Sequence, residues 1–222
     1  MTPAHQVPRI VVLISGRGSN MRALIEAGRR AAAPYEVAAV LSDQPAALGL
    51  GVARELGVPA GAIDPRDSAD RAGFEERLGA AISAEAPALV VLAGFMRILS
   101  AGFVTRFAGR IQNIHPSLLP AYPGLHTHRR VLAAGEREHG ATVHYVTAEL
   151  DAGPRILQGR VRVLAGDDEA CLASRVQAVE HRLYPLAVSW HCAGRLRCSD
   201  GAAWLDGRRL EGPVALDSAE AA

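Results

Sequence analysis

The sequence contains no lysine, so arginine supplies all 24 of its basic side chains. A Walker-type phosphate loop is therefore excluded, because that loop needs a lysine to reach the phosphates. The three cysteines, Cys171, Cys192 and Cys198, are odd in number and lack the paired spacing of a zinc site. We expect them to be free thiols in a reducing compartment.

Long apolar runs and a strong net charge are also missing. No run approaches the roughly 20 residues that a membrane-spanning helix needs, and the first residues, MTPAHQVPR, do not resemble a secretory signal. The formal net charge of +1 creates no field that favours nucleic acid or a membrane. We therefore expect a cytoplasmic protein, a monomer or a homodimer, with small-molecule substrates and neither nucleic-acid nor membrane partners.

The chain is rich in apolar residues: 49% of its 222 residues are hydrophobic, enough for one full core. Short, largely β-branched runs predict buried strands at Arg9–Ile14, Val37–Leu41, Ala60–Ile63 and Ala88–Ala93. Helical patterns lie between these runs, one of them around Gly49–Leu56. This alternation predicts a single-domain α/β fold with a doubly wound, mostly parallel sheet and a Rossmann-like N-terminal half.

The order of elements changes after about residue 110. A predicted strand at Ile111–Ile114 runs into Pro116–Pro123, a segment too stiff and too poor in donors for a helix or a central strand. The remaining elements are predicted as a helix near Arg129–Ala134, strands at Ala141–Val146 and Arg155–Leu164, and a long helix from Leu172 to Leu186. We expect one domain over residues 8–212 and a disordered tail over 213–222.

A glycine-rich loop, Ser15–Asn20, lies where the first strand turns into a helix. Free backbone N–H groups and the positive end of the helix dipole favour an anion there. A single phosphate fits better than a dinucleotide, because the acidic residue that would bind a ribose about 20 positions on is not at a clear strand end. The nearest candidate for it, Asp43, is better explained as part of a turn. The same residues also suit a plain strand-to-helix turn with a cap.

Asn113 and His115 are the clearest catalytic candidates. In an extended strand both side chains point to the same face. Pro116 ends the strand, so both lie at the strand's carboxyl end, where open α/β sheets bind ligands. Asn can donate to an oxygen that gains charge, and His can move protons near neutral pH. Asp151, in a Gly/Pro turn, can orient the imidazole. Taken singly, each residue also has an ordinary structural explanation.

The segment N-I-H-P-S-L-L-P, followed by Y-P-G-L-H-T-H-R, resembles the hallmark of the formyltransferases that use 10-formyltetrahydrofolate. In that family the residues matching Asn113, His115 and Asp151 are catalytic. Further segments are similar to the family member of purine biosynthesis: Ser15–Asn20, Ala93–Ser100, Leu150–Pro154 and Ala203–Gly207. Matching segments run in order from about Arg9 to Leu210, nearly the whole chain.

The resemblance implies direct formyl transfer from 10-formyltetrahydrofolate to the amine of glycinamide ribonucleotide, through a tetrahedral intermediate and without a metal. It places the ribonucleotide phosphate on Gly18, Ser19 and Asn20, and the ribose hydroxyls on Glu180. Gln177 lies three residues before Glu180 on the same helix face.

The resemblance also implies a folate site, which lies mainly beside residues 96–99. The residues it assigns are Arg71, Met96, Arg97, Ile98, Leu99, Val146 and Asp151. The nucleotide-phosphate-binding half would extend to about residue 107, and the catalytic and folate-binding half from about 108 to 212. Two positions depart from the family pattern, Ala152 where glycine is frequent and Arg155 where an aliphatic residue is common.

Several alternatives stay open. A formyltetrahydrofolate deformylase would share the same centre, as would a methionyl-tRNA formyltransferase, which would need an RNA-binding domain and a basic surface. His115, His126, His128 and Asp151 include suitable zinc ligands for a metal-dependent hydrolase. A module that binds folate or nucleotide without turnover is the non-enzymatic alternative.

Overall fold

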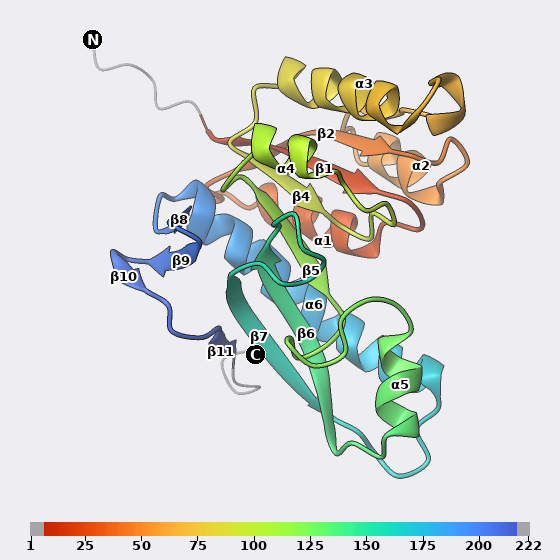
Figure 1. Ribbon diagram of the computed structural model, residues 1–222, viewed down its shortest axis with the longest axis vertical. Coiled ribbons are helices and arrows are strands. Elements are labelled where there is room, and N and C mark those ends of the chain that lie inside the picture. Colours follow the sequence, from red (N-terminus) through yellow and green to blue (C-terminus); the bar gives the residue numbers. More distant parts are fainter. Residues whose placement is uncertain (1–6, 217–222) are drawn as a thin grey trace.

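An eight-stranded sheet forms the centre of this computed structural model, which describes residues 7–216 (Figure 1). Its strands lie in the order β11-β7-β6-β5-β4-β1-β2-β3. Their bounds are β1 Arg9–Ile14, β2 Glu36–Ser42, β3 Ala60–Ala62, β4 Leu89–Leu92, β5 Ile111–His115, β6 Glu138–Tyr145, β7 Arg155–Arg162 and β11 Val214–Leu216. A second sheet has the order β10-β9-β8, from β8 Leu196–Ser199, β9 Ala202–Leu205 and β10 Arg208–Arg209.

Most neighbouring strands of the large sheet are parallel. The pairs from β3 through β2, β1 and β4 to β5 are all parallel, whereas β6 is antiparallel to both β5 and β7. The strand direction changes after β5. The next strand in the sequence, β6, lies beside β5 and runs antiparallel to it. The predicted doubly wound, mostly parallel sheet is confirmed.

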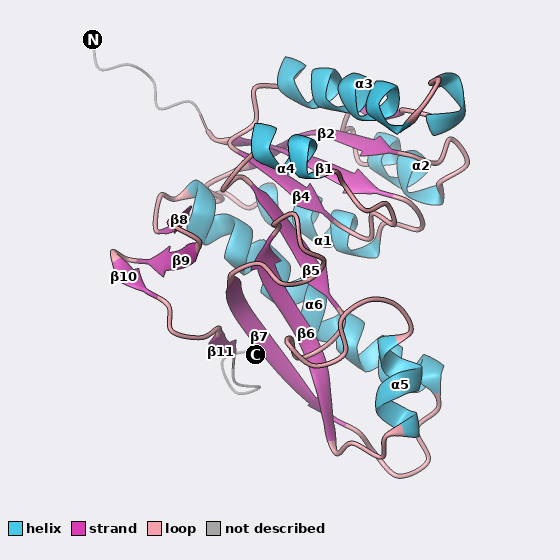
Figure 2. Cartoon of the chain, in the orientation of Figure 1, coloured by secondary structure: helices cyan, strands magenta, loops and turns pink. Residues whose placement is uncertain are grey.

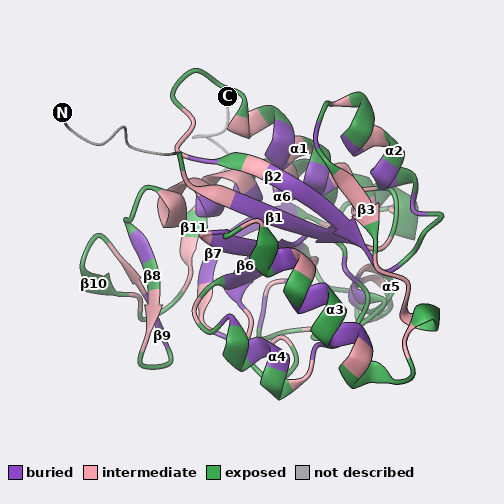
Figure 3. Ribbon diagram, turned by 90° about the horizontal axis from the view of Figure 1, so that it is seen from above, coloured by how far each residue is buried: buried purple, intermediate pink, exposed green. Residues whose placement is uncertain are grey.

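Helices cover both faces of the sheet (Figure 2). One face carries α1 Ser19–Gly28, α2 Leu48–Glu55, α5 Thr127–Ala133 and α6 Glu169–Cys192, and the other carries α3 Arg71–Ala84 and α4 Ala101–Arg106. A short 3-10 helix, η1, spans Pro65–Asp67. Strand β1 alternates between the two cores, with Val12 in the first and Val11 and Leu13 in the second. Figure 3 shows this central layer as the most deeply buried part of the fold.

The long helix α6 connects the two halves of the chain. It packs against α1 in the first half and against β6 and β7 in the second. Leu172, Val176 and Leu183 from the predicted apolar stripe are buried in the core, and Val179 and Leu186 pack against it half-buried. A helix with this span can carry polar side chains from the far end of the sequence to the first loop.

The predicted tail is wrong for Val214–Leu216. These residues form β11, which pairs in parallel with Leu157–Gly159 of β7, whereas residues 217–222 lie outside the described residues. Three residues are too few to show an alternating pattern, so only the free edge of β7 identifies this strand. Helix α4 and the strands β8–β10 were also absent from the sequence-based prediction.

Candidate active site

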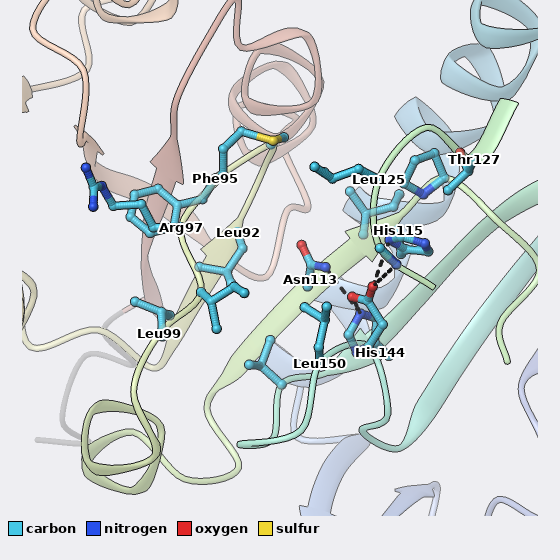
Figure 4. Close-up of a pocket in the computed structure, with 18 of the residues that line it drawn as sticks. Leu92, Phe95, Arg97, Leu99, Asn113, His115, Leu125, Thr127, His144 and Leu150 are labelled. Carbon is cyan, nitrogen blue, oxygen red and sulfur yellow. Dashed lines mark hydrogen bonds and ion pairs between the residues drawn. The ribbon is translucent and has the colours of Figure 1, made fainter. Parts of the chain in front are cut away.

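A cavity of about 460 Å³ opens at the carboxyl ends of β4 and β5. Figure 4 shows Asn113, His115 and His144 grouped at one end, with Leu92, Phe95 and Leu99 across from them. The polar end contains titratable and amide groups, and the other wall is apolar. This combination is typical of a site that holds a largely flat organic molecule and reacts with one end of it.

Asn113 is held by a histidine from the adjacent strand. β5 and β6 pair so that Asn113 and His144 are directly opposite, and Asn113 Nδ2 lies 3.2 Å from His144 Nε2. His144 Nδ1 faces the carbonyl oxygen of Tyr145 at 3.0 Å, so Nδ1 carries the proton and Nε2 accepts from the amide. Burial lowers the pKa of His144, although the Tyr145 carbonyl and Asp151 oppose this shift. A neutral His144 therefore orients the amide of Asn113.

His115 is the second polar residue of the cavity, and its side chain is only 8% exposed. Its Nε2 lies 3.0 Å from the carbonyl oxygen of Tyr122, to which it can only donate. Nδ1 lies 3.5 Å from Asp151 Oδ2. That distance is too long for a good hydrogen bond. Nδ1 therefore faces Asp151 without a close hydrogen bond to it, and it lies at the cavity, where it can contact a ligand.

Asp151 reaches this position because its loop folds back tightly onto β6. Its backbone is left-handed, with φ of 53°, and its Oδ2 accepts from the N–H of Gly124 at 2.9 Å. A Cβ on Gly153 would lie 1.8 Å from the carbonyl oxygen of Tyr145, so only glycine permits this approach. Asp151 Oδ1 is 3.8 Å from His144 Nε2, which is not an ion pair because His144 is neutral.

The structure therefore brings the three predicted catalytic residues together; spacing predicted this for Asn113 and His115, and Asp151 joins them through its loop. His144 is the polar member that sequence reasoning missed. Period-two alternation in the predicted strand places it on one face with Thr142, but nothing in the sequence reveals that Asn113 lies opposite. The pairing of β5 with β6 supplies that information.

Most residues predicted to bind folate line the cavity: Met96, Arg97, Ile98, Leu99, Val146 and Asp151. Met96 and Ile98 are 68% and 64% exposed, which is unusual for large apolar side chains and leaves a surface that a ligand can cover. Residues 96–99 belong to the first half of the chain and Asn113 to the second. The predicted division near residue 107 thus runs through the cavity.

The two arginines predicted for folate binding are engaged with the protein. Arg97 donates from Nε to Asp43 Oδ2 at 3.0 Å, and its guanidinium lies 5.2 Å from the Phe74 ring centre. Arg71 donates from Nη2 to the carbonyl oxygen of Ile98 at 2.7 Å and does not line the cavity. A direct contact of Arg71 with folate stays a prediction, and the structure gives it a bracing contact instead.

The predicted phosphate loop has a bare helix start. Gly18 precedes α1 with φ of 76°, and as a glycine it offers no side chain to cap the first N–H groups of the helix. These uncapped amides and the helix dipole favour a phosphate. The conformation suits glycine, because a side chain at this φ would be strained.

Two α6 side chains reach this loop, as their shared face predicts. Gln177 Nε2 donates to Ser19 Oγ at 2.9 Å, and Asn20 Nδ2 donates to Glu180 Oε2 at 2.8 Å. Glu180 is only 7% exposed, and burial raises the pKa of its carboxyl despite the hydrogen bond from Asn20. A carboxylate held this way is well placed to accept from a diol, but its contact with ribose stays a prediction.

The remaining sequence observations have local explanations. Ala152 is not among the described residues with positive φ, so the replacement of glycine adds no strain there. Arg155 begins β7 and lines a separate groove together with Arg209 and the loop at Thr147–Glu149.

Among residues 7–216 no three His, Cys, Asp or Glu side chains are grouped to hold a metal ion. The ring of His126 contacts Arg129, and the ring of His128 contacts His139. Within that same range no helix is both long enough and apolar enough to span a membrane.

Comparison with known proteins gives consistent matches. The formyl transferase family model matches residues 8–188. A phosphoribosylglycinamide formyltransferase of Escherichia coli strain K12 is 53% identical over 206 residues, covering 90% of this chain and 95% of that protein. A solved phosphoribosylglycinamide formyltransferase from Coxiella burnetii is 45% identical with a TM-score of 0.91, covering 96% of this chain and 100% of that one. A formyltetrahydrofolate deformylase structure from Pseudomonas syringae is 26% identical with a TM-score of 0.82, and this chain covers 66% of it.

Proposed function

The chain belongs to the formyl transferase family, and we propose that it transfers the formyl group of 10-formyltetrahydrofolate to the amine of 5′-phosphoribosylglycinamide. The products are formylglycinamide ribonucleotide and tetrahydrofolate, in a step of purine biosynthesis. The observation that carries the proposal is the convergence of Asn113, His115 and Asp151 in one cavity. The much higher identity to phosphoribosylglycinamide formyltransferases than to the deformylase favours a ribonucleotide acceptor over water.

The reaction begins when the amine of the ribonucleotide attacks the formyl carbon. A carbon–nitrogen bond forms while the carbonyl π bond opens, and the tetrahedral intermediate carries its charge on the former formyl oxygen. The Asn113 amide and protonated His115 donate to this oxyanion. Neutral His144 keeps the Asn113 amide in the donating orientation, because Nε2 accepts one of its hydrogens.

Collapse of the intermediate breaks the bond between the formyl carbon and N10 of the folate. The attacking nitrogen loses a proton and the leaving nitrogen gains one, so the transfer is balanced without another reactant. Asp151 stabilises the imidazolium of His115 and helps to relay this proton. Its carboxylate is kept in place by the N–H of Gly124.

The two substrates occupy different parts of the molecule in this proposal. The pterin of the folate lies beside Met96–Leu99, where backbone groups and apolar walls suit a flat heterocycle. The ribonucleotide phosphate binds the start of α1 at Gly18, Ser19 and Asn20. Glu180 accepts from the ribose hydroxyls and Gln177 supports it. No metal takes part, and we propose that the enzyme acts in the cytoplasm as a monomer or a homodimer.

The test is an assay of the purified protein with 10-formyltetrahydrofolate in the presence and absence of phosphoribosylglycinamide. Formylated ribonucleotide should form in step with tetrahydrofolate, and His115→Ala should lose about 100-fold or more in turnover. Hydrolysis of the formyl group of 10-formyltetrahydrofolate that does not depend on the ribonucleotide would identify a deformylase instead. Binding of both substrates without turnover would leave only the binding-module alternative.

A further inference from the structure

Asp43 is a buried carboxylate outside the catalytic group. It follows β2 and is only 2% exposed. Its Oδ1 accepts from Ser15 Oγ at 2.5 Å, and its Oδ2 accepts from Arg97 Nε at 3.0 Å and from Gln44 Nε2 at 3.1 Å. A buried carboxylate needs such donors, because it has lost its contact with water. Two of them, Ser15 and Arg97, come from the segments proposed to bind the two substrates.

Ser15 joins those two segments directly. It is the first residue of the phosphate loop, and its backbone N–H donates to the carbonyl oxygen of Gly94 at 3.0 Å. Its Oγ also accepts from the N–H of Met96 at 2.9 Å. Because Asp43 takes the hydroxyl hydrogen, the lone pairs of Ser15 Oγ remain available to Met96. Asp43 thus determines which way this hydroxyl acts.

Arg97 completes the link on the folate side. Its guanidinium is held between Asp43 and the ring of Phe74. The charge on Asp43 strengthens its hydrogen bonds to Arg97 and Ser15 alike. Through these contacts one carboxylate holds both the first residue of the phosphate loop and the middle of the folate segment.

A second buried carboxylate provides an internal comparison. Glu75 accepts from Arg71 Nε at 3.0 Å and from the N–H of Ser100 at 2.8 Å, and Arg71 also donates to Ile98. This group braces the far end of the same folate segment. None of its hydrogen bonds among the described residues reaches the phosphate loop.

We propose that Asp43 is a positioning residue for both substrates, holding the phosphate loop and the folate segment in register through Ser15 and Arg97. Glu75, by contrast, positions the folate segment alone. The inference rests on the proposed function, because it assigns one substrate to each segment. Asp43 contacts neither substrate, so its removal affects the KM of both more than kcat.

Initial-rate kinetics with both substrates varied tests this assignment. Asp43→Asn keeps the shape but removes the charge, and it should raise the KM for both substrates about tenfold, with kcat changing less than about threefold. Glu75→Gln should raise the KM for 10-formyltetrahydrofolate alone. Asp64→Asn removes a carboxylate that pairs with the exposed Arg66, which belongs to neither segment, and should leave both constants unchanged.

A double-variant cycle identifies the route to the ribonucleotide. Ser15→Ala and the combined Ser15→Ala, Asp43→Asn variant should show the same KM for phosphoribosylglycinamide, because both break the same link. Equal effects of Asp43→Asn and Glu75→Gln on both substrates, or additive effects of the two Ser15 and Asp43 changes, would overturn the inference. If Asp43→Asn does not fold, Arg97→Gln takes its place in the test. Arg97→Gln should raise the KM for 10-formyltetrahydrofolate only, and a matching rise in the KM for the ribonucleotide would also overturn the inference. Wild-type protein that forms no formylated ribonucleotide would refute the proposed function itself.

Discussion

The proposed catalytic end and the proposed nucleotide end of this molecule are built in opposite ways. At the catalytic end, Asn113, His115 and Asp151 are side chains held by neighbouring strands and loops of one half of the chain. At the nucleotide end, the proposed donors are the first backbone N–H groups of α1, after Gly18. The side chains that support it, Gln177 and Glu180, come from α6, more than 150 positions later in the sequence.

Single substitutions should therefore have different effects at the two ends. A side chain that donates to a charge formed only in the transition state cannot be replaced by the backbone, so its loss reduces turnover. Backbone amides at a helix start survive most substitutions, so changes at the nucleotide end should affect substrate binding more mildly.

The largest effect is expected for Asn113→Ala. It removes a donor to the oxyanion, and kcat should fall about 100-fold or more with a much smaller change in either KM. Steady-state kinetics on protein of unchanged thermal stability measures this. Near-normal turnover would show that the amide does not stabilise the intermediate.

A smaller loss is expected for His144→Phe. The aromatic shape is kept, but Asn113 loses the acceptor that orients its amide, so kcat should fall about tenfold. His191→Phe is a control, because His191 is a half-buried histidine that contacts the Tyr145 hydroxyl and does not line the cavity. An equal loss in both variants would mean that His144 acts through general stability.

At the nucleotide end, Glu180→Gln should raise the KM for the ribonucleotide about fivefold, because a neutral amide is a weaker acceptor for hydroxyl groups. The value for kcat should change little. A loss confined to kcat would place Glu180 at the catalytic end and break the comparison.

The same substitution has a pH-dependent effect on stability. Burial raises the pKa of Glu180 above its ordinary value of 4.5. The folded state therefore favours the protonated carboxyl, and stability declines as the pH rises from 4.5 through the raised pKa. Glu180→Gln removes this penalty, so its Tm should exceed that of the wild type at neutral pH and the gain should vanish toward pH 4.5. Thermal melts across this range test it, and a gain that grows on acidification would contradict the cause.

The smallest effect is expected for Ser19→Ala. The backbone N–H groups of the loop remain, and only the hydroxyl bonded to Gln177 is lost. The KM for the ribonucleotide should rise less than about threefold. A rise of thirtyfold would mean that the side chain, rather than the helix start, carries the phosphate.

The sequence predicted the strands of the first half well, because buried parallel strands have continuous apolar runs with clear ends. It also placed Asn113 and His115 on one face, since a strand alternates by two residues. It missed His144 because the sequence of neither strand shows which residues of β5 and β6 lie opposite each other. It also predicted a folate ligand at Arg71, which stays a prediction, and it did not reveal that this guanidinium donates to the carbonyl oxygen of Ile98. A surface arginine has many partners within reach, and only the folded chain selects one.

By itself the sequence determined the alternation of strands and helices, the loop at Ser15–Asn20 and the motif that resembles formyltransferases. These are local properties, set by side-chain spacing and backbone preference. Only the tertiary structure shows the pairing of Asn113 with His144, the approach of α6 to the proposed phosphate loop and the link from Asp43 to both proposed substrate segments. Such contacts join residues far apart in the chain, and they depend on how the sheet and helices pack, which no local pattern encodes.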